Sequence, residues 1–272
     1  MRLLDKGDNA VALFHLPVFT FDERKKHMTT KSHRRAWLLV TAALLCMTTV
    51  SYSQISLQVG GGLGYAMPAS DFSGTTVEYY EGKNYGLAGG LNFHGKVRFG
   101  ILGLKLTGEA SYSLFSNDGE SQPGQGKVET KKRILALKVG PEFQLSLPAV
   151  PVTPYLGLNV AFNSFSGSTT FQGVSGVSSG TFDLTGASRI GVGGTVGTLI
   201  SLAGTNLDVA LHYNLHNLTG KSWEGADSRI DTYSGLNDEK DPAYAPGDNK
   251  HVVQNSRSIH SIIVTVSVMF GF

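Results

Sequence analysis

The sequence lacks the features that stabilise small disulfide-rich proteins or helical membrane proteins. Its single cysteine, Cys46, excludes an internal disulfide. Outside one segment near the start there is no run of about 18 or more apolar residues, which excludes a bundle of transmembrane helices. Only 16% of the residues are charged and 41% are hydrophobic, so the chain is not of the disordered class.

Glycine and aromatic residues are abundant instead. The 272 residues include 34 glycines, and 10% of the residues are aromatic. This composition favours an all-β protein with many turns and close backbone approaches. The sequence contains no phosphate-binding loop, dinucleotide fingerprint or Cys/His metal constellation, so it predicts no cofactor and no metal site.

One segment near the start has the organisation of a secretory signal peptide. The chain is basic from Met28, apolar from Ala36 to Val50, and then carries the small-x-small triplet Ser51-Tyr52-Ser53. A basic region, an apolar region and a small-residue cleavage site define such a signal. We therefore predict a signal peptide over residues 28–53.

Two alternatives for this segment are a transmembrane anchor and a lipoprotein signal. The apolar run is short for an anchor. Lipidation at Cys46 is disfavoured because Leu45 stands where a small residue is needed. Residues 1–27 have no periodicity, and we interpret them as an extension of the basic region or as a start codon assigned too early.

Residues 54–272 form the predicted mature domain. They carry 15 Lys and Arg against 17 Asp and Glu, a net charge of about −2. The pI of about 8.5 for the whole chain therefore mostly reflects the removed segment. A basic footprint for nucleic acid is absent, and we expect no nucleic-acid partner.

The mature domain repeats a hydrophobic period of two residues in segment after segment. Such alternation is typical of strands with two chemically different faces, and no convincing helix is present. We predict eight strands at about residues 54–67, 84–98, 102–115, 132–147, 153–165, 188–202, 205–216 and 259–272.

One face of these strands is apolar and the other carries charge. The last strand places His260, Ile262, Val264, Val266, Val268, Phe270 and Phe272 on one face. Charged residues on the polar faces are Lys96, Arg98, Lys105, Glu109, Lys138, Glu142, Arg189 and Asp208. A water-soluble sandwich also alternates, but strands of 11 or more residues match a tilted membrane crossing. Hydrocarbon allows no unpaired sheet edge, so we predict a closed, up-and-down, transmembrane antiparallel β-barrel.

The connections and the aromatic residues agree with this topology. The connections after strands two, four and six are short, and the others are long and polar, as in membrane barrels whose long loops face outside the cell. Aromatic girdles are expected at both membrane interfaces. We place Tyr65, Tyr85, Tyr112, Phe162 and Tyr213 near the outer ends of the strands, and Phe99, Phe270 and Phe272 near the inner ends.

Two segments resemble known outer-membrane proteins. The ending Val264-x-Val266-x-Val268-x-Phe270-x-Phe272 resembles the C-terminal signal that outer-membrane proteins present to the barrel assembly machinery. The glycine-rich opening, Val59 to Phe72, is similar to the first strand and loop of the small porin-like outer-membrane β-barrel domain families. The resemblance spans about residues 54–272 and implies an eight-stranded Omp-type barrel, although the fourth outer loop is longer than is usual there.

The interior charges have three interpretations. An eight-stranded barrel is just wide enough to be filled by side chains, so Lys105, Glu109, Lys138, Glu142, Arg189 and Asp208 are expected to pair inside it. The alternatives are a narrow ion-conducting path and, least favoured, a catalytic role.

Barrel enzymes that modify lipid A need a histidine with a serine or carboxylate at the membrane rim. The candidates are His94, His212, His216 and His260, and only His260 has a serine, Ser258, projected beside it. No carboxylate is fixed there, so we expect no catalytic residue. A barrel protease would need more strands and paired rim carboxylates.

The last long connection, about residues 217–258, is rich in charge. Its acidic residues are Glu224, Asp227, Asp231, Asp238, Glu239, Asp241 and Asp248, and its basic residues are Lys221, Arg229, Lys240 and Lys250. Calcium binding is conceivable, but the spacing matches no ligand motif. We predict a solvated, mobile surface loop, in which Trp223, Tyr233 and Tyr244 are candidates for contact with a partner.

The sequence thus predicts a non-enzymatic protein of the outer membrane of a Gram-negative cell envelope, with a structural or adhesion-like role. The alternatives are a narrow passive pore for ions or small solutes and, less favoured, a lipid A-modifying enzyme. Expected partners are outer-membrane lipid and lipopolysaccharide, the barrel assembly machinery through the strand ending in Phe272, and an extracellular partner through the loops.

Overall fold

The computed structural model describes residues 55–101, 103–122, 124–145, 147, 150–224, 233–245 and 253–271. The predicted signal peptide, the segment before it and Cys46 lie outside the described residues, as do the terminal Phe272 and the loop residues Asp227, Arg229, Asp231, Asp248 and Lys250. Within the described ranges, no helix is long and apolar enough to cross a membrane.

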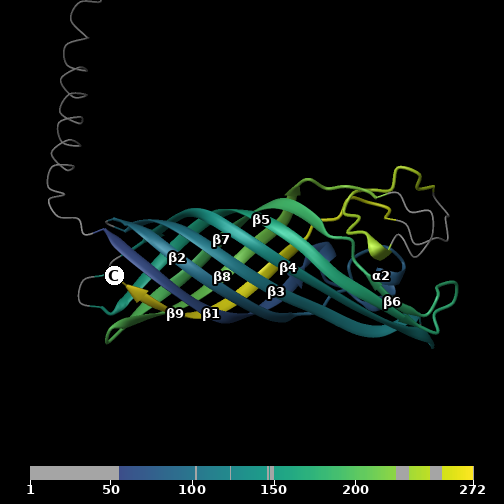
Figure 1. The fold of residues 1–272 in the computed structure, drawn as a ribbon, viewed down its shortest axis with the longest axis horizontal. Coiled ribbons are helices and arrows are strands. Elements are labelled where there is room, and N and C mark those ends of the chain that lie inside the picture. Colours follow the sequence, from purple (N-terminus) through teal and green to yellow (C-terminus); the bar gives the residue numbers. More distant parts are fainter. Residues whose placement is uncertain are drawn as a thin grey trace, which may run out of the picture. The chain divides into compact units, whose positions relative to one another are not determined.

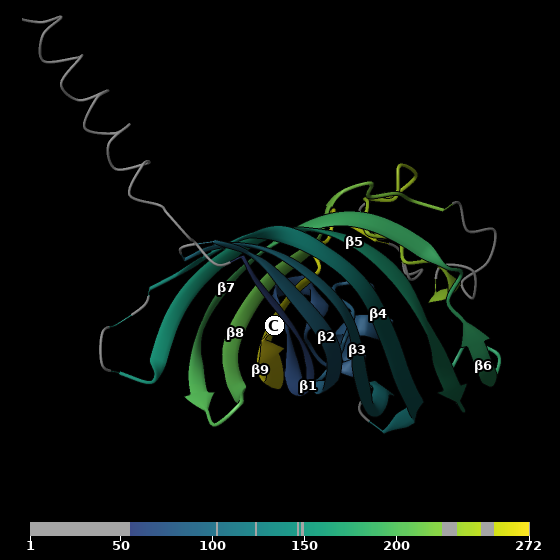
Figure 2. The same ribbon diagram turned by 60° about the vertical axis from the view of Figure 1, so that its left-hand side comes forward.

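Eight long strands close into an antiparallel barrel (Figures 1 and 2). They are β1 (Ser56–Ala69), β2 (Gly90–Ile101), β3 (Leu104–Gln122), β4 (Gln125–Gln144), β5 (Val152–Gln172), β7 (Ala187–Leu202), β8 (Thr205–Thr219) and β9 (His260–Gly271). Each pairs with the next barrel strand, and β1 pairs with β9 to close the ring. The predicted closed up-and-down barrel is confirmed.

The closing seam between β1 and β9 depends on glycine. Gly62 lies opposite Ser267 of β9 and His94 of β2. A Cβ atom at Gly62 would lie 2.0 Å from the carbonyl oxygen of Val266, and one at Gly60 would lie 2.1 Å from that of Val268. Only a residue without a side chain allows so close a backbone approach.

The outside of the barrel is an apolar belt. Leu63, Leu91, Leu137 and Val160 are between 52% and 62% exposed, so the largest apolar side chains point away from the barrel interior. We call the end where β1 begins the inner end, and the opposite end the outer end. Aromatic residues lie exposed near both ends of the belt, with Tyr65, Tyr112, Phe162 and Tyr213 at the outer end and Phe99 and Phe270 at the inner end.

Tyr85 is a correction to the predicted girdle. It is only 1% exposed, because β2 begins at Gly90 and not at residue 84. Its ring packs edge-on against Phe72, with the ring centres 5.6 Å apart. The residues before β2 thus turn over the barrel mouth and do not extend along the wall.

The strands β3, β4 and β5 continue well beyond the apolar belt. The predicted loop between residues 115 and 132 is instead a hairpin, in which β3 runs on to Gln122 and β4 begins at Gln125. The outward side chains of β4 change from apolar, Leu135 to Phe143, to charged at Arg133 and Lys131. Ten residues separate Leu135 from Gln125, which is about 30 Å along the strand.

The strand extensions and the long connections form a folded structure that we call the crown, comprising residues 70–89, 116–131, 166–186 and the described parts of 217–259. It contains the short strand β6 (Gly180–Asp183), the turn η2 (Ser70–Phe72) and the helix α2 (Thr76–Tyr80). β6 pairs with the extension of β5 (Figure 2). The helix corrects our expectation of none; five residues are too few to show a helical period.

The free edge of β3 in the crown is covered by the first connection. The Thr76 hydroxyl donates to the carbonyl of Glu120 at 2.8 Å, and the Asn117 amide donates to the carbonyls of Gly74 and Gly86 at 3.2 and 2.9 Å. The helix α2 is fixed by a capping box between Thr75 and Glu78. The edge of the extended sheet is therefore protected.

We predict that Gly62→Ala prevents closure between β1 and β9, because its methyl group would overlap the β9 backbone. The folded barrel should then lose its heat-modifiable migration on an electrophoresis gel. Gly108→Ala is the matched control, because no atom lies within 4 Å of a Cβ at that lipid-facing glycine. A Gly62→Ala protein that migrates as the wild type does would contradict this account of the seam.

Candidate functional site

The inner half of the barrel interior holds a network of charged side chains, which we call the ion network: Lys96, Arg98, Glu142, Asp208 and Tyr155. The fully buried Arg98 guanidinium is 2.7 Å from Glu142 Oε1 through Nε and 2.8 Å from Asp208 Oδ2 through Nη2. Lys96 Nζ lies 3.0 Å from Glu142 Oε2, and the Tyr155 hydroxyl donates to Asp208 at 2.6 Å. The four charges come from three separate strands, so the network ties opposite walls of the barrel together.

A second ion pair lies beside the network. Lys138 Nζ donates to Glu109 Oε1 at 2.8 Å, on neighbouring strands β4 and β3. The predicted interior pairing is thus confirmed for Glu109, Lys138, Glu142 and Asp208. It is wrong for Lys105, which donates to the Ser56 hydroxyl and to the Gly100 carbonyl. Lys105 lies near the inner end, where no carboxylate of the described wall reaches it within ion-pair distance.

The interior histidines are paired with hydroxyl groups of β9. His94 Nε2 lies 2.6 Å from the Ser267 hydroxyl, His212 Nε2 lies 3.0 Å from that of Thr265, and His216 Nε2 lies 2.7 Å from that of Ser261. In none of these hydrogen bonds is the partner a carboxylate. These rings therefore pack and bridge strands, and they do not form the acid–base pair that a barrel enzyme needs.

The candidate rim pair is not assembled. His260 Nδ1 shares a 2.7 Å hydrogen bond with the Tyr213 hydroxyl. The Ser258 hydroxyl instead accepts from Lys221 Nζ at 3.3 Å. Ser258 and His260 share no hydrogen bond in the described structure, so His260 does not have the serine partner that its position in the sequence indicated.

Above the ion network an apolar plug closes the outer mouth of the barrel. Its residues from the connections are Phe72, Tyr85, Leu87 and Leu236, and its residues from the walls include Phe115, Ile134, Phe165 and Ile263. Phe72 packs edge-on against Phe115, with ring centres 4.9 Å apart. Residues that are distant in the sequence thus form one buried cluster inside the barrel.

The interior retains little free space between the network and the plug. A cavity of about 20 Å³ lies against Lys96, Glu109, Lys138 and Asn159. That volume holds roughly one water molecule. At this level the interior is filled by side chains, as expected for an eight-stranded barrel.

The last connection is fixed to the barrel through Asp238, which is fully buried. Arg189 binds it with two nitrogens, Nη2 at 2.7 Å from Oδ1 and Nε at 3.0 Å from Oδ2. The Asn217 amide donates to Oδ2 at 2.8 Å, and the backbone N–H of Ser222 donates to Oδ1 at 3.0 Å. Arg189 was predicted to pair within the barrel interior, and its partner is in fact this loop carboxylate.

Burial opposes the ionisation of Asp238, but the hydrogen bonds from Arg189, Asn217 and Ser222 outweigh it and hold the pKa of the carboxyl below its ordinary value. Arg257 fixes the same connection from the other side. Its guanidinium stacks on Tyr85 at 4.1 Å and donates to the carbonyls of Leu236 and Asn237. The prediction of a solvated loop is therefore wrong for residues 235–238 and Arg257, which are buried, while Glu239 and Lys240 are exposed as expected.

The loop aromatics divide into buried and partly exposed groups. Tyr233 is 2% exposed and packs against Phe171, with ring centres 4.7 Å apart, so it is not the partner contact that we predicted. Trp223 and Tyr244 remain half-buried at the crown surface. In the described part of the chain, no group of three or more His, Cys, Asp or Glu side chains is placed to hold a metal ion.

No protein-family profile and no curated protein matches the sequence. Among solved structures, the chain is similar to Neisserial surface protein A, with 15% identity over 79% of this chain and 97% of that one, at a TM-score of 0.46. It is also similar to a major outer membrane protein of Thermus thermophilus, with 14% identity over 79% and 99% of the chains, at 0.45. A third is Ail, the attachment invasion locus protein of Yersinia pestis, in complex with a heparin analogue, with 10% identity over 80% and 99%, at 0.40.

The closed ring of eight strands, the apolar outside and the charged inside decide the fold. It is a closed, eight-stranded antiparallel β-barrel of the membrane-spanning type. The ion network and the plug lie inside this barrel, and the crown lies at its outer end.

We predict that Glu142→Gln destabilises the barrel by about 3 kcal/mol, because Lys96 and Arg98 would then share one buried carboxylate. Urea unfolding of the barrel folded into lipid vesicles measures the change. Glu129→Gln is the control, because its 2.6 Å pair with Lys131 is exposed and should contribute less than about 1 kcal/mol. Equal effects of the two substitutions would contradict a stabilising role for the network.

We predict that Asp238→Asn releases the last connection, because Arg189 would lose its buried counter-charge at a cost of about 3 kcal/mol or more. Trp223 reports this release, since Trp37 lies in the predicted signal peptide and Trp223 is then the only tryptophan of the mature chain. Its fluorescence should become accessible to iodide quenching at neutral pH. Glu239→Gln, an exposed neighbour with the same loss of charge, should leave the quenching unchanged.

The pH dependence follows from the lowered pKa of Asp238. The ionised carboxylate contributes its full stability above the ordinary aspartate pKa of about 3.9, and the contribution is lost as the pH falls through the lower folded value. Wild-type Trp223 should thus keep its partial protection at pH 5 and lose it only as the pH falls below the ordinary aspartate pKa toward the lower folded value. The Asp238→Asn protein should show no such transition, and a transition in both proteins would assign it to another group.

Proposed function

We propose that this chain is a non-enzymatic outer-membrane protein that is exported through the signal peptide at residues 28–53 and presents its crown at the cell surface in a structural, adhesion-like role. The observation that carries the proposal is the folded crown above a barrel whose interior is filled. Because side chains fill the interior of the barrel, a partner would have to bind to the outside of the protein. The crown supplies a surface fixed by Asp238, Arg257 and the plug.

The absence of an assembled rim dyad supports a non-enzymatic role within the described residues. His260 is engaged by Tyr213, and the interior histidines bind hydroxyl groups. General acid–base chemistry at the rim would need a carboxylate or serine held by the histidine.

The rival role, a narrow passive pore, would need a continuous aqueous path. Arg98 bridges Glu142 and Asp208 across the inner half of the interior, and the plug fills the mouth above. Opening a path would require separating these buried ion pairs. The packing therefore favours the surface role over conduction.

Three kinds of partner fit this proposal. Outer-membrane lipid and lipopolysaccharide would surround the belt, and the barrel assembly machinery would engage the last strand, β9, with Phe272, which follows it in the sequence. An extracellular partner would bind the crown, whose outward side chains on β4 are polar and charged above Leu135. Aromatic girdles at both ends of the belt set the depth of the barrel in the bilayer.

A crown-trimmed variant tests the proposal. Residues 116–131 are replaced by Asn-Gly, so that Phe115 and Lys132, which pair in register, flank a two-residue hairpin. Cells expressing the wild type should bind epithelial monolayers at least tenfold better than cells expressing the variant, with both barrels heat-modifiable. Glu129→Gln is the control for a minor change at the same hairpin. Equal binding by wild type, trimmed variant and empty cells would reject the adhesion-like role.

Planar bilayers test the rival. The wild-type protein should show no stable conductance steps, because its interior is filled. Stable steps that persist in the purified, heat-modifiable protein would favour the pore instead.

A further inference from the structure

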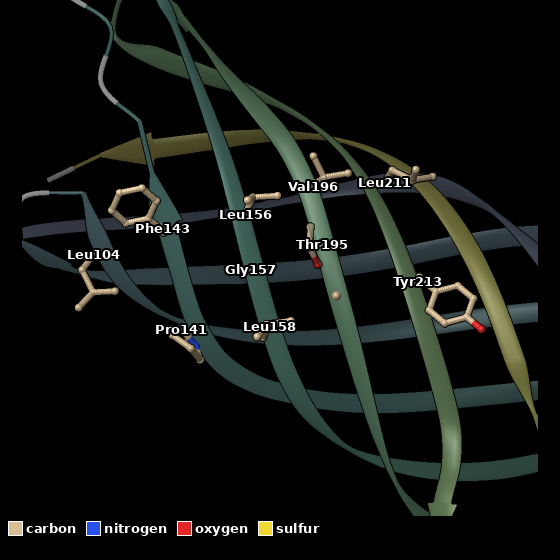
Figure 3. Close-up of a pocket in the computed structure, with 11 residues that line it drawn as sticks. Leu104, Pro141, Phe143, Leu156, Gly157, Leu158, Thr195, Val196, Leu211 and Tyr213 are labelled. Carbon is tan, nitrogen blue, oxygen red and sulfur yellow. The ribbon is translucent and has the colours of Figure 1, made fainter.

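A groove of about 600 Å³ runs along the outer wall of the barrel, within the apolar belt (Figure 3). Leu104 and Phe143 line one end, where β3 begins and β4 ends, and Tyr213 of the outer girdle lines the other. The groove therefore crosses β3, β4, β5, β7 and β8 along the registered row Leu104, Phe143, Leu156, Val196 and Leu211. Because the strands of a barrel are tilted, this row rises obliquely around the wall from the inner end toward the outer end.

The floor of the groove is open because of Gly194. This residue faces outward on β7, in register with Leu158 of β5 and Tyr213 of β8. Leu158 is 68% exposed and Tyr213 is 51% exposed, so both stand above the glycine as walls. At Gly194 the groove is thus bounded by two large side chains, one on each neighbouring strand.

Packing does not require glycine at this position. A Cβ atom at Gly194 would meet nothing closer than Leu158 Cδ2, at 3.9 Å, whereas one at Gly62 would overlap backbone. Gly194 is also not one of the described glycines with a positive φ, so its backbone conformation does not require glycine. A larger residue would fit sterically, and its effect would be to fill the groove.

The outer end of the groove leads to polar groups at the rim. The Tyr213 hydroxyl is hydrogen-bonded to His260, and Lys221 donates to the hydroxyls of Ser256 and Ser258 at 3.2 and 3.3 Å. The two serine hydroxyl groups are uncharged, and Lys221 forms no ion pair with any residue of the described rim. The nearby carboxylate of Asp71 accepts instead from the backbone N–H of Ser258 at 2.8 Å.

We propose that this groove binds an acyl chain of a phosphate-bearing outer-leaflet lipid, whose phosphate is held at the rim by Lys221 beside Tyr213 and His260. The inference rests on the proposed function, because it requires the barrel to lie in the outer membrane. An ammonium group forms charge-assisted hydrogen bonds with phosphate, and a lysine beside a tyrosine is typical of the membrane interface.

A second copy of the chain fits the groove less well. A stable protein interface buries about 800 Å² on each partner with closely matched surfaces. Here the walls formed by Leu158 and Tyr213 protrude on both sides of a narrow channel, which suits a single flexible chain. The polar groups at the outer end of the groove also match a lipid, whose headgroup and tail differ in chemistry.

Native mass spectrometry of the detergent-folded mature barrel tests the proposal, with hexa-acylated diphosphoryl lipid A as the probe. The wild type should retain one lipid molecule. Gly194→Leu should weaken binding at least tenfold by filling the groove, and Lys221→Gln should weaken it about tenfold by removing the phosphate contact. Gly108→Leu is the matched control, because it fills an open, lipid-facing glycine position on β3 outside the groove.

Heat-modifiable migration confirms that each variant is folded before binding is compared. Equal retention by Gly194→Leu and wild type, or an equal loss in Gly194→Leu and Gly108→Leu, would overturn the proposal. Lipid A without phosphates that binds as tightly as the probe would overturn the phosphate contact. A wild type that dimerises through the groove and separates in Gly194→Leu would overturn the lipid as occupant.

Failure of this inference is distinguishable from failure of the proposed function. A protein that retains no lipid but still supports adhesion through its crown would overturn only the groove assignment. A protein that retains lipid and supports no adhesion would overturn only the surface role. Both readouts use the same wild-type barrel.

Discussion

Hydrocarbon offers no hydrogen bonds to a peptide backbone, and this constraint shapes the whole molecule. Every backbone N–H and C=O within the bilayer must find a partner in the chain itself. Eight strands satisfy this by closing on themselves, and the closure brings β1 so near to β9 that Gly60 and Gly62 have no room for a side chain. The apolar belt outside and the polar interior follow from the same alternation along each strand.

Closing the ring creates an interior that must be filled, and the chain fills it in two ways. In the inner half, charged side chains from facing walls neutralise one another around Arg98. In the outer half, apolar side chains from the connections pack against those of the walls. The first arrangement depends on geometry between strands, and the second depends on segments that return into the barrel from outside.

The barrel itself could be predicted from the sequence because the membrane imposes a simple alternation. The eight strands, their closure, their two faces and most aromatic positions are read from single residues and their spacing. Glu109 and Lys138 were identified as interior charges for the same reason, since inward charges at matched depth must be neutralised.

The crown was not predictable in this way, because one face of its strands contacts water and the other contacts protein, and no face contacts lipid. Beyond Leu135 the outward residues of β4 are polar, while inward residues such as Thr130 and Lys132 are polar as well, so the alternation disappears. Asp238 and Arg189 meet across 49 positions of sequence, and a run of charges in a long loop does not reveal which one is buried. The Thr75–Glu78 capping box was the one local signature of α2.

The cover that the first connection places over the β3 edge has a consequence for contacts between neighbouring copies of the barrel. An extended sheet that rises far above the bilayer would otherwise offer a row of unpaired peptide groups to any neighbouring copy. The Thr76 hydroxyl and the backbone N–H of Ala88 occupy the Glu120 and Ser116 carbonyls of that row on β3, and the Asn117 side chain holds the first connection over the edge. Neighbouring molecules can then stand close together without fusing their sheets at this edge, which leaves the outward side chains of the hairpin exposed to the surroundings.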